Sequence, residues 1–250
     1  MNWFTPKCPV APDEKSWLDE SMLWLLDEFG ADTLRNAVVV LPTEEFFPDP
    51  YSGEEEDVWL LVSRVCGYMG VDPDRLELEL YADEECELRR NLPSHEGQHG
   101  GAVGHYQKRR GKFVIAIEYS QVSDPVSLVA TVAHELGHVL LLGGGRASAG
   151  WEDHEALTDL LTVFLGMGVF TGNTAFRFSQ WTDAFSQGWQ AERLGYMTEE
   201  MFGYALALFA RGRAERGPAW AKYLEGNVGA YFKSSCKYLE KTGDTPLAPL

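Results

Sequence analysis

Two histidines and a glutamate stand close together near the middle of the sequence. His134, Glu135 and His138 lie within the stretch VSLVATVAHELGHVLLL. Residues four apart on an α-helix lie about one turn apart on the same face, so both imidazoles can reach one tetrahedral zinc ion. Glu135 follows the first histidine directly and can hydrogen-bond a water on the metal without displacing it. Because zinc lowers the pKa of such a water to about 7, the pattern predicts metal-assisted hydrolysis with Glu135 as the base.

The residues around this motif favour the same interpretation. The helix predicted from Asp124 to about Leu142 is apolar nearly all round, and the three motif residues are its only ionisable groups after Asp124. Charged groups in a buried helix need partners, because an unpaired buried charge is costly. A zinc ion supplies such a partner. The alternative is a set of core residues in a private hydrogen-bond network.

A hydrolytic zinc site needs a third protein ligand and one open position. The segment WEDHEALTDLL follows the motif, and we expect a helix over residues 152–169. Glu155 and Asp159 are four apart and share one helix face, so both can face the same metal centre. A histidine that binds a metal usually donates its second N–H to a carboxylate, which fixes its tautomer. Besides Glu155, the residues that remain candidates for the third ligand are Glu152, Asp153, His154 and Asp159.

Together, the HELGH and ExxxD patterns resemble those of the gluzincins, the thermolysin-like branch of the zincin metallopeptidases. The resemblance covers residues 126–165 and implies that His134, His138 and Glu155 bind zinc while Asp159 orients His134. The family often has Asn before the glutamate ligand, where this chain has His154. The chain also resembles, more weakly, the short bacterial metallopeptidases of the ImmA/IrrE type, some of which cleave a regulator.

Catalysis of peptide hydrolysis also requires a group that stabilises the oxyanion. His154, Arg146, Tyr119 and Tyr196 are candidates for oxyanion or substrate contacts, and the sequence does not choose among them. Residues 112–119 form a predicted strand just before the motif helix. The zincin resemblance implies that this strand edges the cleft and accepts a substrate peptide by strand addition; the alternative is an ordinary buried strand. Three further histidines in or beside the Gly-rich stretch 91–104 are interpreted as solvated loop residues: His95, His99 and His105.

Composition limits the classes of partner. The 250 residues include 38 acidic and 21 basic ones, a formal net charge of −17, which argues against nucleic-acid and membrane-surface binding. The four cysteines form no CxxC pair and are typical of reduced thiols. The N-terminal segment lacks the apolar core of a signal peptide, and no apolar stretch is long enough to span a bilayer. We therefore expect a cytoplasmic protein, or one exported by a route that the sequence does not show.

Hydrophobic periodicity predicts helices over residues 16–29, 54–69, 198–211 and 219–239, strands over 36–41 and 76–81, and a hairpin over 105–119. This order indicates an α+β fold with a small mixed sheet, a zincin-like core over residues 1–170 and a helical, aromatic-rich extension over 171–250 packed on it as one unit. The sequence thus predicts a zinc metallopeptidase acting on a peptide or protein. Two alternatives are a zinc-bound sensor or protein-interaction module that cleaves nothing, and a structural or toxin-neutralising acidic protein without metal. The oligomeric state is left open.

Overall fold

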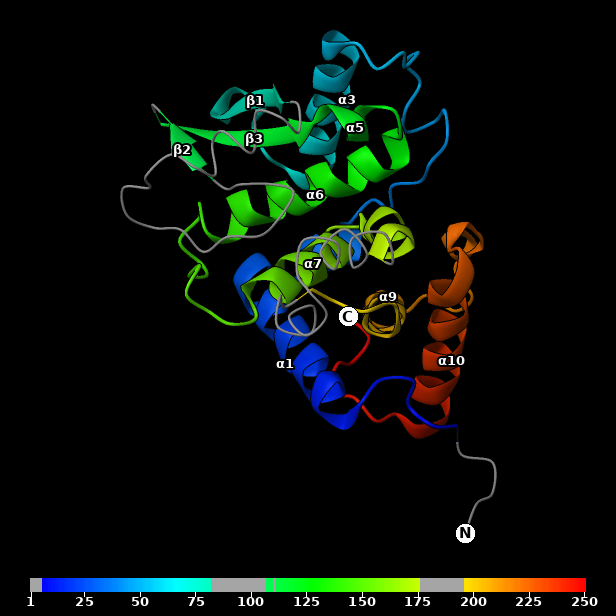
Figure 1. Ribbon diagram of the computed structural model, residues 1–250. Helices are drawn as coiled ribbons and strands as arrows, with labels where there is room; N and C mark the ends of the chain where they lie inside the picture. Colours follow the sequence, from blue (N-terminus) through cyan, green and yellow to red (C-terminus); the bar gives the residue numbers. More distant parts are fainter. Residues whose placement is uncertain (1–5, 82–106, 110, 176–195) are drawn as a thin grey trace, which may run out of the picture.

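The computed structural model describes residues 6–81, 107–109, 111–175 and 196–250. The elements within them are α1 (Pro12–Phe29), α2 (Ala31–Asn36), α3 (Glu55–Met69), η1 (Pro73–Arg75), β1 (Leu76–Tyr81), β2 (Gln107–Arg109), β3 (Lys112–Glu118), α5 (Tyr119–Val122), α6 (Pro125–Leu141), α7 (His154–Phe164), α9 (Glu199–Gly212), η3 (Ala219–Tyr223) and α10 (Gly226–Thr242). Figure 1 shows the sheet above α6, α6 above α7, and α7 above α1 and α9. The predicted α+β layout is confirmed.

The sheet has three described strands in the order β1-β3-β2. β1 runs parallel to β3 with Leu76 opposite Phe113 and Tyr81 opposite Glu118. β2 runs antiparallel to β3, so the sheet is mixed, and both the strand at residues 76–81 and the hairpin are confirmed. Within the described residues β2 pairs with β3 at positions 112–114 only, so β3 is an inner strand there, and its place beside a cleft stays a prediction.

The capping residues of α6 and α9 begin these helices where the sequence predicts. The Asp124 side chain accepts a hydrogen bond from the Ser127 amide at the start of α6, and Pro125 occupies the first turn. Thr198 likewise accepts from the Met201 amide at the start of α9. α6 is buried along almost its whole length, because β3, α3 and α7 all pack against it.

Residues 36–41 do not form the predicted strand and have no regular strand structure. The Val40 amide donates to the Gly166 carbonyl at 3.0 Å. The Arg213 Nη1 donates to the Ala37 carbonyl at 2.7 Å. The Gly166 carbonyl and the Arg213 side chain, both later in the chain, thus satisfy these backbone groups of the segment. The segment therefore needs no neighbouring strand to pair with.

Two long predicted helices are interrupted. The helix expected over 152–169 ends at Phe164, and a new helical segment begins at residue 168. Gly166 has φ +88°, and a Cβ there would lie 2.2 Å from the Val38 carbonyl oxygen, so the break requires glycine. The helix expected over 219–239 divides into η3 and α10.

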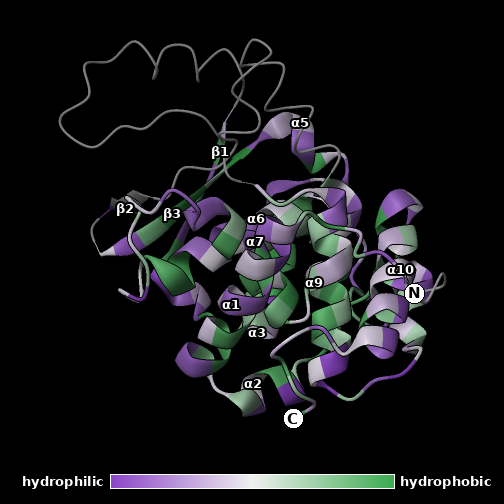
Figure 2. Cartoon of the chain, turned by 90° about the horizontal axis from the view of Figure 1, so that it is seen from below, coloured by the Kyte–Doolittle hydropathy of each residue, from purple (hydrophilic) through white to green (hydrophobic). Residues whose placement is uncertain are grey.

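One hydrophobic cluster of the described residues includes side chains from both sides of residue 170, such as Leu18 and Met22 of α1, Phe164 of α7 and Phe209 of α9. Figure 2 shows hydrophobic residues along α9, whereas hydrophilic residues are frequent on α1 and α10. The described part of residues 171–250 therefore packs directly on the earlier helices. Residues 91–104, with their histidines, lie outside the described residues.

A buried carboxylate links the two ends of the chain. The Asp19 side chain accepts hydrogen bonds from Lys15 Nζ at 2.8 Å, Tyr204 OH at 3.3 Å and Thr245 Oγ1 at 2.7 Å. Asp19 is only 4% exposed, so its negative charge depends on these three donors in place of water. Helices α1 and α9 and the C-terminal residues are joined at this point.

Replacement of this carboxylate tests the connection. We expect Asp19→Ala to lower the free energy of unfolding by about 3 kcal/mol, because the Lys15 ammonium and two hydroxyls lose their acceptor. Urea denaturation followed by circular dichroism measures the change. Glu20→Ala, at the exposed neighbouring position, is the control and should shift stability by no more than about 0.5 kcal/mol. Equal unfolding curves for the two variants would contradict the connection.

Candidate metal centre

The centre is built where α6 and α7 come closest. A Cβ added at Gly137 of α6 would lie 2.7 Å from Thr158 Cγ2 of α7, so only glycine allows this separation of the helices. Thr158 is fully buried. At the start of α7, the Trp17 indole N–H of α1 donates to Asp153 Oδ2 at 2.7 Å and holds the preceding loop in place. This close approach brings the polar face of α6 onto the polar face of α7.

His134 is oriented by an acid on the facing helix. Its Nδ1 lies 2.9 Å from Asp159 Oδ1. The second oxygen, Asp159 Oδ2, accepts from the Met197 amide at 3.0 Å. A carboxylate acceptor at Nδ1 fixes the proton on that nitrogen and leaves the lone pair on Nε2. Both oxygens of Asp159 thus have partners, and its carboxylate holds the His134 ring in this orientation.

His138 is oriented by a hydroxyl group. Thr158 Oγ1 donates its single proton to the His154 carbonyl at 2.8 Å. The same oxygen lies 3.2 Å from His138 Nδ1 and can therefore only accept there, which places the proton on Nδ1. The Nε2 lone pair of His138 is left free, as in His134. Sequence analysis did not identify Thr158, although its position three residues after Glu155 and one before Asp159 places it between them on α7.

Glu155 completes a group of three ligand atoms. Its Oε2 lies 3.0 Å from His134 Nε2 and 3.3 Å from His138 Nε2. One ligand atom from each of the three residues lies within 4.8 Å of the others. Two imidazole lone pairs and a carboxylate oxygen repel one another unless a cation stands between them. The donor set of two histidines and one glutamate fits zinc, which takes these ligands in hydrolytic sites.

Buried carboxylates set the charge preference of this centre. Burial lowers the pKa of His134, but the hydrogen bonds and charges of Asp159 and Glu155 outweigh burial and raise the pKa well above its usual value. Burial raises the pKa of Glu155, whereas its contacts with His134, His138 and His154 hold the pKa well below its usual range. The groups therefore favour a positive charge between them, which a divalent cation can supply.

Glu135 lies next to the first histidine on α6 and is 5% exposed. Among the described residues its carboxylate forms no hydrogen bond or ion pair. The Tyr196 ring stacks on His134 with the ring centroids 5.6 Å apart. Burial, followed by the negative charges of Glu155, Asp159 and Glu135, raises the pKa of the Tyr196 hydroxyl above its usual value. Tyr196 is thus held neutral beside three carboxylates and remains a hydrogen-bond donor.

The remaining predicted contact residues separate into two groups. His154 lies at the centre, with Nε2 3.2 Å from Glu155 Oε1 and Nδ1 2.8 Å from the Trp151 carbonyl. The hydrogen bond to Glu155 raises the pKa of His154 above its usual value despite burial. His154 therefore contacts the glutamate oxygen opposite to the one that faces His134 and His138.

Arg146 and Tyr119 are not brought to the centre. The Arg146 guanidinium stacks 4.8 Å from the Phe29 ring centroid and lies 3.7 Å from Glu28, both on α1. Tyr119 is 55% exposed and precedes the first turn of α6, whereas His134 lies about 13 Å further along that helix at 1.5 Å per residue. Neither residue is in position to act as an oxyanion contact.

No protein-family model matches this chain, and comparisons with curated proteins and with solved structures likewise give no match. Among the described residues, the helices are all too short or too polar to cross a membrane. Cys8, Cys66 and Cys236 are free thiols, while Cys86 lies outside the described residues.

The contact between Gly137 and Thr158 can be tested by a double-mutant cycle. We expect Gly137→Ala to destabilise the protein by about 1–3 kcal/mol, because the new methyl group overlaps Thr158 Cγ2. Thr158→Ser removes that methyl group and keeps the hydroxyl, so the double variant should regain most of the loss. Denaturant unfolding of the four proteins measures the coupling. Strictly additive effects would show that this contact does not set the helix separation.

Proposed function

We propose that this chain is a zinc-dependent metallopeptidase with a zincin-like active site, which hydrolyses peptide bonds in a peptide or protein substrate. The supporting observation is the convergence of His134 Nε2, His138 Nε2 and Glu155 Oε2, whose ligand atoms lie within 4.8 Å of one another. The partners at the two Nδ1 atoms, Asp159 and Thr158, direct both lone pairs toward this point. A site with three protein ligands retains an open position for substrate or water.

A zinc ion in such a site acts as a Lewis acid that polarises a carbonyl group and lowers the pKa of water. Glu135 accepts a proton from the attacking water and delivers it to the nitrogen of the leaving amine, so the scissile C–N bond breaks with proton balance. Its carboxylate suits this role because it is buried and uncommitted among the described residues.

Tyr196 fits the role of the oxyanion donor. Its neutral hydroxyl stands in a buried site beside His134, and such donors stabilise charge that develops on the carbonyl oxygen. His154 holds Glu155 from the outer side and acts as a positioning residue. Asp159 and Thr158 hold the two histidines in the tautomer that binds metal.

Metal content tests the proposed ligands. Elemental analysis after dialysis should find about one zinc per wild-type chain. His138→Ala and Glu155→Gln should lose it, because each removes a converging donor atom. Asp159→Asn should weaken zinc binding by about 10–100-fold, since it only orients a ligand. Glu152→Gln, at an exposed acid three residues before Glu155, is the control and should retain zinc. Wild-type protein without bound metal, even after reconstitution, would refute the proposed centre.

Activity tests the proposed reaction. In digests of an unbiased peptide library followed by mass spectrometry, wild-type protein should release fragments and Glu135→Gln should not, although it keeps its zinc. Tyr196→Phe should lower kcat by about 100-fold or more with little change in KM, because the hydroxyl acts mainly on the transition state. Zinc-loaded protein that cleaves no peptide would exclude the peptidase and leave the non-catalytic zinc-bound module.

A further inference from the structure

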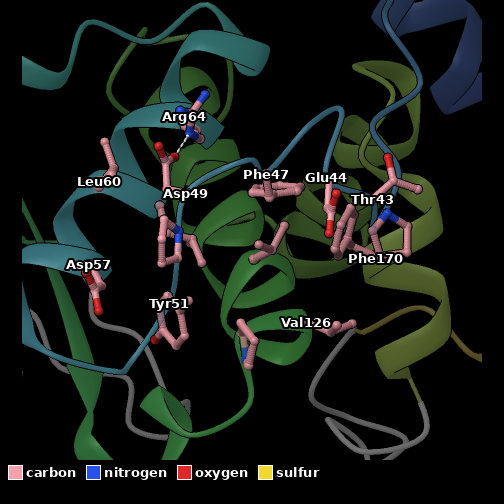
Figure 3. A pocket seen from close by; sticks show the side chains of 15 residues that line it. Thr43, Glu44, Phe47, Asp49, Tyr51, Asp57, Leu60, Arg64, Val126 and Phe170 are labelled. Atoms are coloured by element: carbon pink, nitrogen blue, oxygen red, sulfur yellow. Dashed lines mark hydrogen bonds and ion pairs between the residues drawn. The ribbon is translucent and has the colours of Figure 1, made fainter.

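A pocket of about 280 Å³ lies away from the metal centre, between α3, the first turns of α6 and the irregular segment 42–51 (Figure 3). Val126 and Val129 contribute from α6, whereas His134 lies further along the same helix. The residues that line it are mostly apolar: Pro42, Thr43, Glu44, Phe47, Asp49, Pro50, Tyr51, Asp57, Leu60, Leu61, Arg64, Pro125, Val126, Val129 and Phe170. The pocket shares no residue with the candidate metal centre.

Side-chain hydrogen bonds hold the irregular segment in place around the pocket. Tyr51 OH donates to the Val122 carbonyl at 2.8 Å. Tyr68 OH donates to the Phe46 carbonyl at 2.6 Å. Such anchors fix the loop before any ligand arrives, so binding does not have to order it. The pocket is therefore a preformed feature of the fold.

Aromatic contacts hold one wall, and an ion pair holds another. The Phe47 ring packs edge-on against Tyr68 and Phe170, with ring centroids 6.0 and 5.6 Å apart. Asp49 accepts a hydrogen bond from Arg64, which the dashed line in Figure 3 marks. These contacts leave the Phe47 ring as a fixed apolar surface.

The mouth of the pocket exposes apolar side chains to water. Leu60 is 42% exposed and Val126 is 38% exposed, and both line the pocket. Trp59, next to Leu60 on α3, is also 38% exposed. Apolar side chains gathered around a cavity mouth are typical of a surface that a partner covers.

The charge around the pocket is acidic. Three lining residues, Glu44, Asp49 and Asp57, carry negative charge against the single positive charge of Arg64, which Asp49 neutralises. Hydrogen bonds from Ser52 lower the pKa of Asp57, so it stays ionised. Glu44 and Asp57 form no ion pair within the described parts of the chain, and Figure 3 shows them on opposite sides of Phe47. A cationic ligand is favoured, and the formal charge of −17 steers one toward the chain.

We propose that this pocket binds one aromatic or large aliphatic side chain of a partner protein, presented within a segment rich in lysine or arginine. The volume suits such a side chain, since an apolar cavity of about 150 Å³ already holds benzene. The flanking cations would pair with Glu44 and Asp57. A polypeptide would also cover the exposed apolar rim formed by Leu60 and Val126.

Synthetic peptides test the proposed partner. The probe is Lys-Lys-Phe-Lys-Lys, with its ends blocked, added to the full chain and followed through the methyl NMR signals of Leu60, Val126 and Val129. We expect saturable shifts at these methyl groups and an affinity that weakens with salt. Two control peptides, Lys-Lys-Ala-Lys-Lys and Glu-Glu-Phe-Glu-Glu, should each bind at least tenfold more weakly. Phenethylamine that binds as tightly as the peptide would overturn the polypeptide assignment.

Paired variants locate the binding. Leu60→Lys should weaken peptide binding at least tenfold, because it removes apolar surface and adds a positive charge at the mouth. Leu23→Lys, at a leucine on α1 that is 38% exposed and lies outside the pocket, is the matched control and should bind normally. The double variant Glu44→Gln with Asp57→Asn should reduce the affinity and its salt dependence, whereas Glu20→Gln should not. Unchanged binding in Leu60→Lys, or shifts confined to other methyl groups, would overturn the proposal.

Discussion

The close approach of α6 and α7 at Gly137 is the constraint on which the candidate metal centre depends. A side chain at this position would meet Thr158 at 2.7 Å, so the missing Cβ sets the helix separation. At that separation Thr158 reaches His138 and the next residue, Asp159, reaches His134. Both contacts place protons on Nδ1 and free the Nε2 lone pairs. One steric fact in the backbone therefore fixes both the positions and the tautomers of two imidazoles, which is what a metal site requires before any ion binds.

The charges of the centre follow from its burial. His134, Glu135, His138 and Asp159 are each less than 9% exposed, on helices whose other buried residues are mostly apolar. In such surroundings carboxylates cannot rely on water, so each needs a donor or a cation. Asp159 has two donors, His134 and the Met197 amide, whereas Glu155 faces the Nε2 lone pairs of His134 and His138 and therefore favours a cation between them. Glu135 alone has no partner among the described residues, which sets it apart as the group available to a water or substrate. The proposed division of roles among these acids rests on this difference in their surroundings.

The sequence predicted the helices and strands that carry strong local signals, and it failed where tertiary contacts decide. Asp124 and Thr198 cap their helices through their own side chains, a local interaction that the sequence reveals. The apolar segment at 36–41 looks like a strand, but its backbone partners are Gly166 and Arg213, more than 120 residues away, and no local pattern shows them. The candidate metal centre shows the same contrast between local and tertiary signals. The spacing of His134 and His138 is visible in the sequence, whereas the choice between Glu155 and Asp159 is not, because it depends on which oxygen atoms already have partners. Thr158 was missed because a threonine in an apolar helix carries no signal of its own.

The sequence predicts a core over residues 1–170 and an extension over 171–250. The candidate metal centre does not respect this division, because residues from both parts contribute to it. The Met197 amide holds the second oxygen of Asp159, and the Tyr196 ring covers His134, so both lie at the centre although they follow residue 170. A fragment ending near residue 170 would keep all three proposed ligands and still lose the hydrogen bond that holds the orienting acid. Without it, Asp159 would be free to turn from His134 toward a cation, and the distinction between ligand and orienting group would be lost. The segment just before α9 therefore belongs to the candidate centre, as the later helices belong to the packing of the core.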